Sequence, residues 1–112
     1  TTKSACTNTN PEGYIDLSPT MITRDMFVIS KFAPISDAGA GHYTNGEVYR
    51  VYTDDTCIQF DVRIGETQFL NYPAGSIREF TMTDRENVMN TIHDILQNTT
   101  LVNAGEKIVL PQ

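Results

Sequence analysis

The side chains of this chain best suited to chemistry include two cysteines. Cys6 lies in a leader rich in Thr and Asn, and Cys57 lies just after Asp54-Asp55. A disulfide between them would join a segment with few apolar residues to a strand of the predicted sheet, and the long loop it closes would make it worth about 4 kcal/mol. Two free buried thiols are the alternative. We predict the bond, which implies an oxidising compartment and a secreted, periplasmic or cell-surface location.

The two histidines give a weaker signal for catalysis or metal binding. His42 and His93 are far apart, and the chain has no Cys-x-x-Cys or His-x-x-x-His spacing, so we predict no metal site. We interpret His93 as a residue at the boundary of a packed helix face. His42 follows Asp37 in a glycine-rich segment that lacks both the third glycine and the flanking elements of a dinucleotide-binding loop. We therefore predict no catalytic residue and no cofactor.

Composition narrows the classes of partner. The chain has 112 residues, which is the size of one domain, and its 14 acidic against 8 basic residues give a net charge of -6. The basic residues are scattered singly, which argues against nucleic acid, because clustered Lys and Arg supply most of the affinity for phosphates. No apolar run is long enough for a membrane-spanning helix. A protein or a component of the cell envelope remains as the expected partner, and the oligomeric state stays open.

Turn-forming residues and apolar runs divide the chain into segments. Residues 1–20 are rich in turn formers, and we interpret them as an extended arm laid over the domain. The strands of the sheet are expected within residues 26–64, beginning with the β-branched and aromatic run 26–35, in which Pro34 should mark an edge or an end. Residues 36–46 are rich in glycine and are expected to form a loop.

A β-hairpin is the clearest local signal. Residues 47–53 and 56–64 flank Asp54-Asp55, and the second segment alternates strictly between apolar and polar residues. If the two aspartates form the turn, Val51 faces Ile58 and Tyr49 faces Phe60 on one side of the sheet. Asp-Asp is a weaker signal than Asn-Gly, so a longer loop is the alternative.

A helix is predicted over residues 83–98. Thr83 and Glu86 have the spacing of a capping box, and an apolar stripe follows that would pack on the sheet: Val88, Met89, Ile92, Ile95 and Leu96, with Phe80 and Met82 leading in. Residues 99–112 form a tail that contains either an edge strand or a disordered end. The expected fold is therefore α+β, a small antiparallel sheet with a C-terminal amphipathic helix packed on one face.

Residues 36–102 resemble a group of known domains. The segments SDAGAGHYTNGEVYRVYTDDTCIQF, NYPAGSIREF and ILQNTTLV are similar to the C-terminal part of uncharacterised bacterial exported or lipoprotein-like domains. This resemblance implies a PsbP-like α+β sheet with a helix packed on it. It also implies that Cys57 is the strand cysteine that pairs with an upstream one, here Cys6. No activity is attached to the group, so the resemblance bears on fold and compartment only.

Irregular backbone beside a well-ordered hairpin is where binding groups are usually found. The segment from Asp37 to Tyr43 enters the hairpin directly, and the turn that contains Tyr72 would flank it. We predict that His42, Tyr43 and Tyr72 offer planar, partly apolar contacts and that Asp37 offers a charge. The plainer interpretation is that these residues only complete the surface.

Three functions follow from these patterns. The leading hypothesis is a non-catalytic extracytoplasmic binding or interaction domain. The second is a structural subunit of a surface assembly, or a module of a longer exported protein. The third is a small hydrolase or hydrolase inhibitor, which rests only on Asp37, His42 and the segment 69–72.

Overall fold

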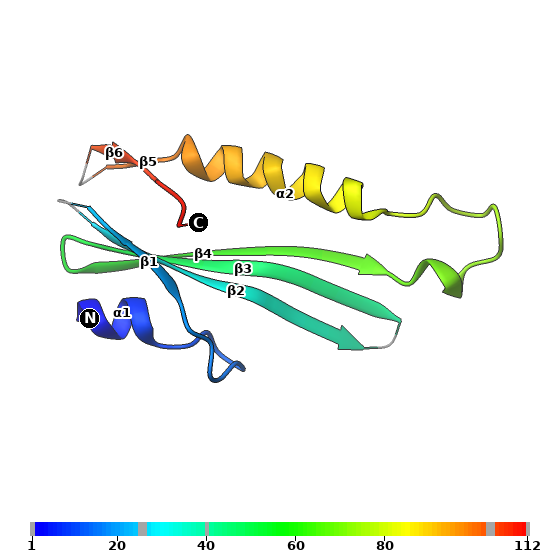
Figure 1. The fold of residues 1–112 in the computed structure, drawn as a ribbon, viewed down its shortest axis with the longest axis horizontal. Helices are drawn as coiled ribbons and strands as arrows, with labels where there is room; N and C mark the ends of the chain where they lie inside the picture. The colour runs from blue at the N-terminus through cyan, green and yellow to red at the C-terminus, as the bar shows by residue number, and fades with distance from the viewer. Residues whose placement is uncertain (1, 25–26, 40, 103–104, 112) are drawn as a thin grey trace.

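The computed structural model describes residues 2–24, 27–39, 41–102 and 105–111 and has the α+β fold expected from the sequence (Figure 1). Four antiparallel strands form one sheet in the order β1-β2-β3-β4: β1 (Thr20–Thr23), β2 (Val28–Gly39), β3 (His42–Thr53) and β4 (Thr56–Thr67). Helix α1 (Lys3–Asn8) lies on one face and helix α2 (Met82–Gln97) runs along the other (Figure 1). A 3-10 turn, η1 (Phe69–Asn71), follows β4, and a short strand pair, β5 (Thr100–Leu101) and β6 (Glu106–Lys107), follows α2.

The hairpin of β3 and β4 has the register predicted from the sequence. Asp54 and Asp55 have φ of 50° and 56°, the conformation of a two-residue type I′ turn, and Thr53 pairs with Thr56. The register then pairs Val51 with Ile58 and Tyr49 with Phe60. Aspartate tolerates the left-handed region better than most residues, and this turn matches the twist of the strands.

The prediction that residues 36–46 form a loop is wrong. Strand β2 continues to Gly39 and β3 begins at His42, with Asp37 opposite Thr44. Because strand propensity depends strongly on context, pairing with a long neighbouring strand outweighs the weak propensity of this segment. Pro34 lies within β2, at a shift of register between Phe32 and Ile35, and not at the end of the strand.

Pro34 does lie on an edge. Strand β1 pairs with β2 only from Val28 to Lys31, so in the described part of the chain no strand flanks the outer side of β2 beyond Lys31. Proline lacks the N–H that a strand would donate, which makes such an unpaired edge one of the few places in a sheet that accept it.

The interpretation of residues 1–20 as an extended arm is wrong for the first turns and for the last residue, because Thr20 begins β1. The Thr2 hydroxyl accepts a hydrogen bond from the Ala5 N–H and caps α1, which buries Cys6. The Arg50 guanidinium donates to the main-chain oxygens of Cys6 and Thr9 and so satisfies carbonyls at the end of this helix.

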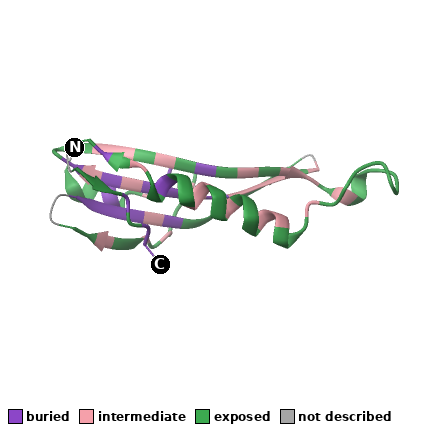
Figure 2. Ribbon diagram, turned by 90° about the horizontal axis from the view of Figure 1, so that it is seen from above, coloured by how far each residue is buried: buried purple, intermediate pink, exposed green. Residues whose placement is uncertain are grey.

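Each face of the sheet has its own core. On the α2 face a larger cluster of buried residues includes Ile29, Tyr49, Val51, Leu96 and Ile108, and on the α1 face a smaller cluster joins Phe32, Ile35 and Val48 with Tyr14 and Leu17 packed against it. Figure 2 shows that the buried residues gather toward the end of the sheet near the chain termini, while the opposite end is mostly exposed or half-buried. The tail adds Ile108 and Leu110 to the larger cluster, so its described part is ordered against the core.

The start of α2 and part of its packed face differ from the prediction. The capping box is formed by Thr81 and Asp84, so the helix begins two residues before the predicted Thr83-Glu86 box would place it. Met89, Ile92 and Leu96 pack on the sheet, whereas Met82, Val88 and Ile95 are 71%, 38% and 63% exposed. The face that α2 turns to the sheet also carries two polar residues, Arg85 and His93, which contact the carboxylates of Glu66 and Glu47.

The structure joins Cys6 to Cys57 by a disulfide that closes a separation of 51 residues. Replacing both cysteines by serine should lower the free energy of unfolding by about 4 kcal/mol, because the unfolded chain regains its loop entropy. Chemical denaturation of the parent and the double variant measures this loss. Mass spectrometry of freshly isolated, unreduced protein should show two fewer hydrogens than the reduced chain, and two free thiols there would contradict the bond.

Adjacent residues of α2 offer a matched test of its packing. Leu96 is 7% exposed and Ile95 is 63% exposed. Leu96→Ala should lower the free energy of unfolding by about 2–4 kcal/mol through lost burial and a cavity, while Ile95→Ala should change it by about 0.5 kcal/mol or less. Denaturant titrations of both variants check this, and equal effects would show that the helix is oriented differently.

Candidate binding cleft

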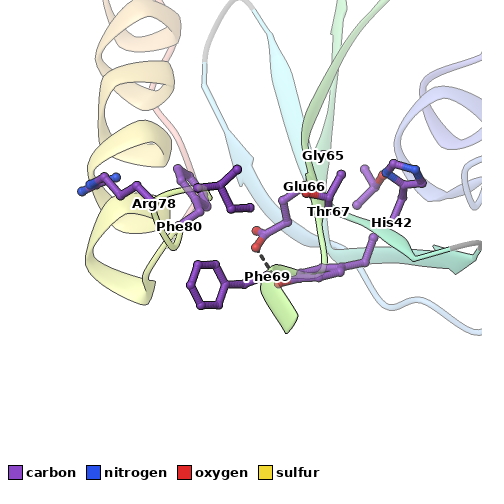
Figure 3. Close-up of a pocket in the computed structure, with 10 residues that line it drawn as sticks. His42, Gly65, Glu66, Thr67, Phe69, Arg78 and Phe80 are labelled. Carbon is purple, nitrogen blue, oxygen red and sulfur yellow. Dashed lines mark hydrogen bonds between the residues drawn. The ribbon is translucent and has the colours of Figure 1, made fainter. Parts of the chain in front are cut away.

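A cleft of 480 Å³ lies where β3 begins and β4 ends, beneath the connection between β4 and α2. Its apolar lining comes from the rings of Tyr43, Phe69 and Phe80 and from Ile77. Its polar lining includes His42, Glu66 and Arg78. Figure 3 shows Glu66 and Phe69 between His42 on one side and Phe80 and Arg78 on the other.

Pairing of β3 with β4 places two of these side chains together. Tyr43 and Glu66 are direct cross-strand partners, and the Tyr43 hydroxyl donates a hydrogen bond of 2.5 Å to the Glu66 carboxylate. Cross-strand partners lie on the same face of a sheet, here the face that α2 covers. The β-ladder therefore fixes the floor of the cleft.

The turn after β4 rests directly on the β2–β3 hairpin. The Gln68 N–H donates to the Gly41 carbonyl at 2.8 Å, and Asn71 lies so close to Gly41 that an added Cβ would come within 2.6 Å of its side-chain nitrogen. Gly41 also has a φ of 79°, which favours glycine. This contact places Phe69 beside His42 and Tyr43. The segment from Asp37 to Tyr43 and the turn that contains Tyr72 therefore meet at Gly41 and Asn71.

Arg85 of α2 binds the two side chains that form the floor of the cleft, Tyr43 and Glu66. Its Nε donates to Glu66 at 2.6 Å and its Nη2 donates to the Tyr43 hydroxyl at 3.0 Å, while the guanidinium lies 5.6 Å from the centre of the Phe80 ring. The Glu66 side chain is only 7% exposed. Hydrogen bonds from Arg85 and Tyr43 lower the pKa of Glu66 despite its burial, and the bond to Glu66 raises the pKa of Tyr43. The floor of the cleft therefore consists of the Glu66 carboxylate, paired with Arg85, and the neutral Tyr43 phenol.

Arg78 links the connection to the start of α2. Its Nη2 donates to the Asp84 carboxylate at 2.9 Å. This hydrogen bond and those from Thr81 lower the pKa of Asp84 to about 2. The same carboxylate therefore caps the helix and holds one wall of the cleft in place.

A second polar cluster lies beneath α2, outside the lining of the cleft. His93 Nε2 lies 3.0 Å from Glu47, the buried Tyr49 hydroxyl donates to the same carboxylate, and Lys31 lies 3.8 Å away on its other oxygen. Burial raises the pKa of Glu47, but these hydrogen bonds and the Lys31 charge outweigh it, so the pKa is lowered. Burial and Glu47 raise the pKa of Tyr49. His93 is half-buried at the edge of the packed face, as its sequence position indicated.

The four binding residues predicted from the sequence are only partly brought together. His42 and Tyr43 line the cleft. Asp37 lines a neighbouring hollow that also contains His42, but its carboxylate accepts from the Ala38 N–H, and no hydrogen bond links it to His42 in the described part of the chain. Tyr72 is 41% exposed and lies outside the lining.

Sequence reasoning missed Glu66, Ile77, Arg78, Phe80 and Arg85 as site residues. A signal existed for Glu66, which has the same parity as the apolar residues of β4 and should therefore point at the packed face. The described residues contain no group of three or more side chains arranged to hold a metal ion. They also contain no helix long and apolar enough to cross a bilayer.

The Glu66 pair has a consequence for pH dependence. Because the folded pKa of Glu66 lies below its ordinary value of 4.5, its contribution to stability is present above that value and is lost as the pH falls through the folded pKa. The Glu66→Gln variant should be less stable at neutral pH and should lose less stability on acidification than the parent. Denaturant titrations from neutral to acidic pH test this, and Glu86→Gln, an exposed change on α2, should leave the parental profile unchanged. Parallel profiles for parent and Glu66→Gln would contradict the role of this pair.

Comparisons of the chain with models of protein families, with curated proteins and with solved structures found no match.

Proposed function

We propose that this chain is a non-catalytic, extracytoplasmic recognition domain that holds an apolar or aromatic group of its partner in the cleft. The observation that carries this proposal is a set of three aromatic rings around an open cleft, with a floor whose carboxylate is already paired with Arg85. Aromatic rings give large contact area at low entropy cost.

The state of the polar groups favours binding over proton transfer. A general base works best when its pKa lies near the working pH, and the hydrogen bonds from Arg85 and Tyr43 lower the pKa of Glu66 instead. The hydrolase or inhibitor hypothesis rests on Asp37 and His42, and it has less support because the Asp37 carboxylate accepts from Ala38 N–H and is not bonded to His42.

The disulfide between Cys6 and Cys57 supports an extracytoplasmic location. Bonds of this kind persist in secreted, periplasmic and cell-surface proteins and are rare in a reducing cytosol. The net charge of -6 disfavours binding to nucleic acid and to anionic lipid surfaces, and so favours a partner of another class. We therefore propose a protein or another envelope component that presents an apolar side chain or ring.

Nuclear magnetic resonance with a fragment library tests the cleft. The library should contain phenyl and indole derivatives of amino acids together with aliphatic ones. We expect backbone amide shifts to change together in residues 42–44, 65–69 and 77–80. Shifts confined to other regions, or no binding by any fragment, would contradict the site.

A pair of neighbouring substitutions gives the control. Phe69 lines the cleft, whereas Leu70 is 91% exposed and lies outside its lining. Phe69→Ala should weaken binding of an aromatic fragment by about tenfold, which corresponds to about 1.4 kcal/mol, and Leu70→Ala should leave it unchanged. Equal affinities for the two variants would show that the ring does not contact the ligand.

A further inference from the structure

We infer that β4 pairs edge to edge with β4 of a second copy of this chain, antiparallel, in the register that places Asp61 opposite Arg63. The first observation is the contrast among the strand edges. Strand β1 is four residues long, and the free edge of β2 carries Pro34 and a shift of register. Short edge strands, proline and bulges are the devices by which proteins prevent edge pairing.

Strand β4 is neither short nor interrupted by proline or a bulge, and its neighbouring charges Asp61 and Arg63 are of opposite sign. Its twelve residues pair with β3 without a break in register, and in the described part of the chain no strand flanks its other side. Helix α1 packs mainly on β2 and β3, on one face of the sheet, and is joined to the start of β4 by the Cys6–Cys57 disulfide. A long, regular edge therefore presents a row of main-chain donors and acceptors.

The hairpin geometry shows which of these groups face outward. The residues that close a two-residue turn exchange hydrogen bonds, so Thr56 bonds to β3, and bonded and non-bonded pairs alternate from there. Gly46 agrees with this assignment, because a Cβ added there would lie 1.9 Å from the Val62 carbonyl oxygen, which must point toward β3. The odd-numbered residues 57–67 consequently direct their N–H and C=O groups away from β3.

Charge then selects one register. In an antiparallel pair of identical edges, odd-numbered residues must face odd-numbered residues. The register centred on Val62 places Asp61 of each copy opposite Arg63 of the other, whereas shifting it by one step in either direction places Asp61 opposite Asp61 or Arg63 opposite Arg63. Directly opposed unlike charges stabilise a sheet, and like charges destabilise it.

The same register is favourable on the other face. It places Phe60 opposite Ile64 and Val62 opposite Val62 of the second copy, and Phe60 and Ile64 are only half-buried in one copy. These are non-hydrogen-bonded pairs, in which side chains approach most closely. Pairing would therefore cover apolar surface that the single chain leaves exposed. The net charge of -6 on each copy opposes association, so we expect micromolar to millimolar affinity.

Two charge-reversal variants test the pairing and its register together. Asp61→Lys makes both positions basic and Arg63→Glu makes both acidic, so each variant should repel itself. In sedimentation equilibrium the parent should show a reversible monomer–dimer equilibrium. The dissociation constant of each variant alone should be at least tenfold higher than that of the parent. An equimolar mixture of the two should recover association, because each copy then meets its opposite. Circular dichroism must first show that both variants are folded, since Arg63 also pairs with Asp61 of its own chain at 2.5 Å and stacks on Tyr14 at 5.8 Å. In the dimer the two charges would exchange this pairing within one copy for pairing between copies.

Hydrogen exchange provides a readout without substitution. In the parent, the amide protons of odd-numbered residues 57–67 should gain protection as concentration rises, while those of even-numbered residues should be protected at all concentrations. A parent that stays monomeric at millimolar concentration would overturn the inference. Variants that associate as the parent does, or a mixture that does not recover association, would overturn it as well.

Discussion

The turn at Asp54-Asp55 sets the constraint on which the rest of the structure depends. Two residues join β3 to β4, so the turn leaves the strands no freedom to slide. The resulting register places Tyr43, Glu47 and Glu66 on the face that α2 covers, and places Cys57 on the face of α1. A slip of one residue in β4 would turn Glu66 away from Arg85 and Cys57 away from Cys6. One local turn thus determines the floor of the cleft and the position of the disulfide.

Helix α2 is held to the sheet in different ways along its length. Its last turn buries Leu96 in the apolar core, its middle places His93 on Glu47, and its first turns place Arg85 on Glu66. Partly buried carboxylate contacts repay their desolvation only when the hydrogen bonds are well placed, and these contacts also fix how the helix is oriented on the sheet. Here the orientation matters, since the Arg85 contact aligns Tyr43 and Phe80 on the cleft.

Sequence reasoning predicted the elements with strong periodicity. The alternation of β4 gave the register of the central hairpin, and the apolar stripe of α2 gave the packing of Met89, Ile92 and Leu96 but wrongly included Val88 and Ile95. It missed the β2–β3 pairing, because glycine-rich residues carry no strand propensity of their own and gain it from a neighbour. It missed α1 because six residues are too few to show a period. The cleft combines strand ends, an irregular connection and a helix start, so its lining depends on tertiary contacts that no local pattern encodes.

The uneven distribution of buried residues along the sheet (Figure 2) has a consequence for adaptability. The molecule is elongated, with extents of 53 × 29 × 19 Å, and the disulfide and the main apolar cluster occupy the end opposite the cleft. Regions with few buried contacts open locally at a small fraction of the global unfolding free energy. The walls of the cleft can therefore open locally while the covalently closed end remains intact. Such a division lets one small domain tolerate sequence change at one end without endangering the folded state of the other.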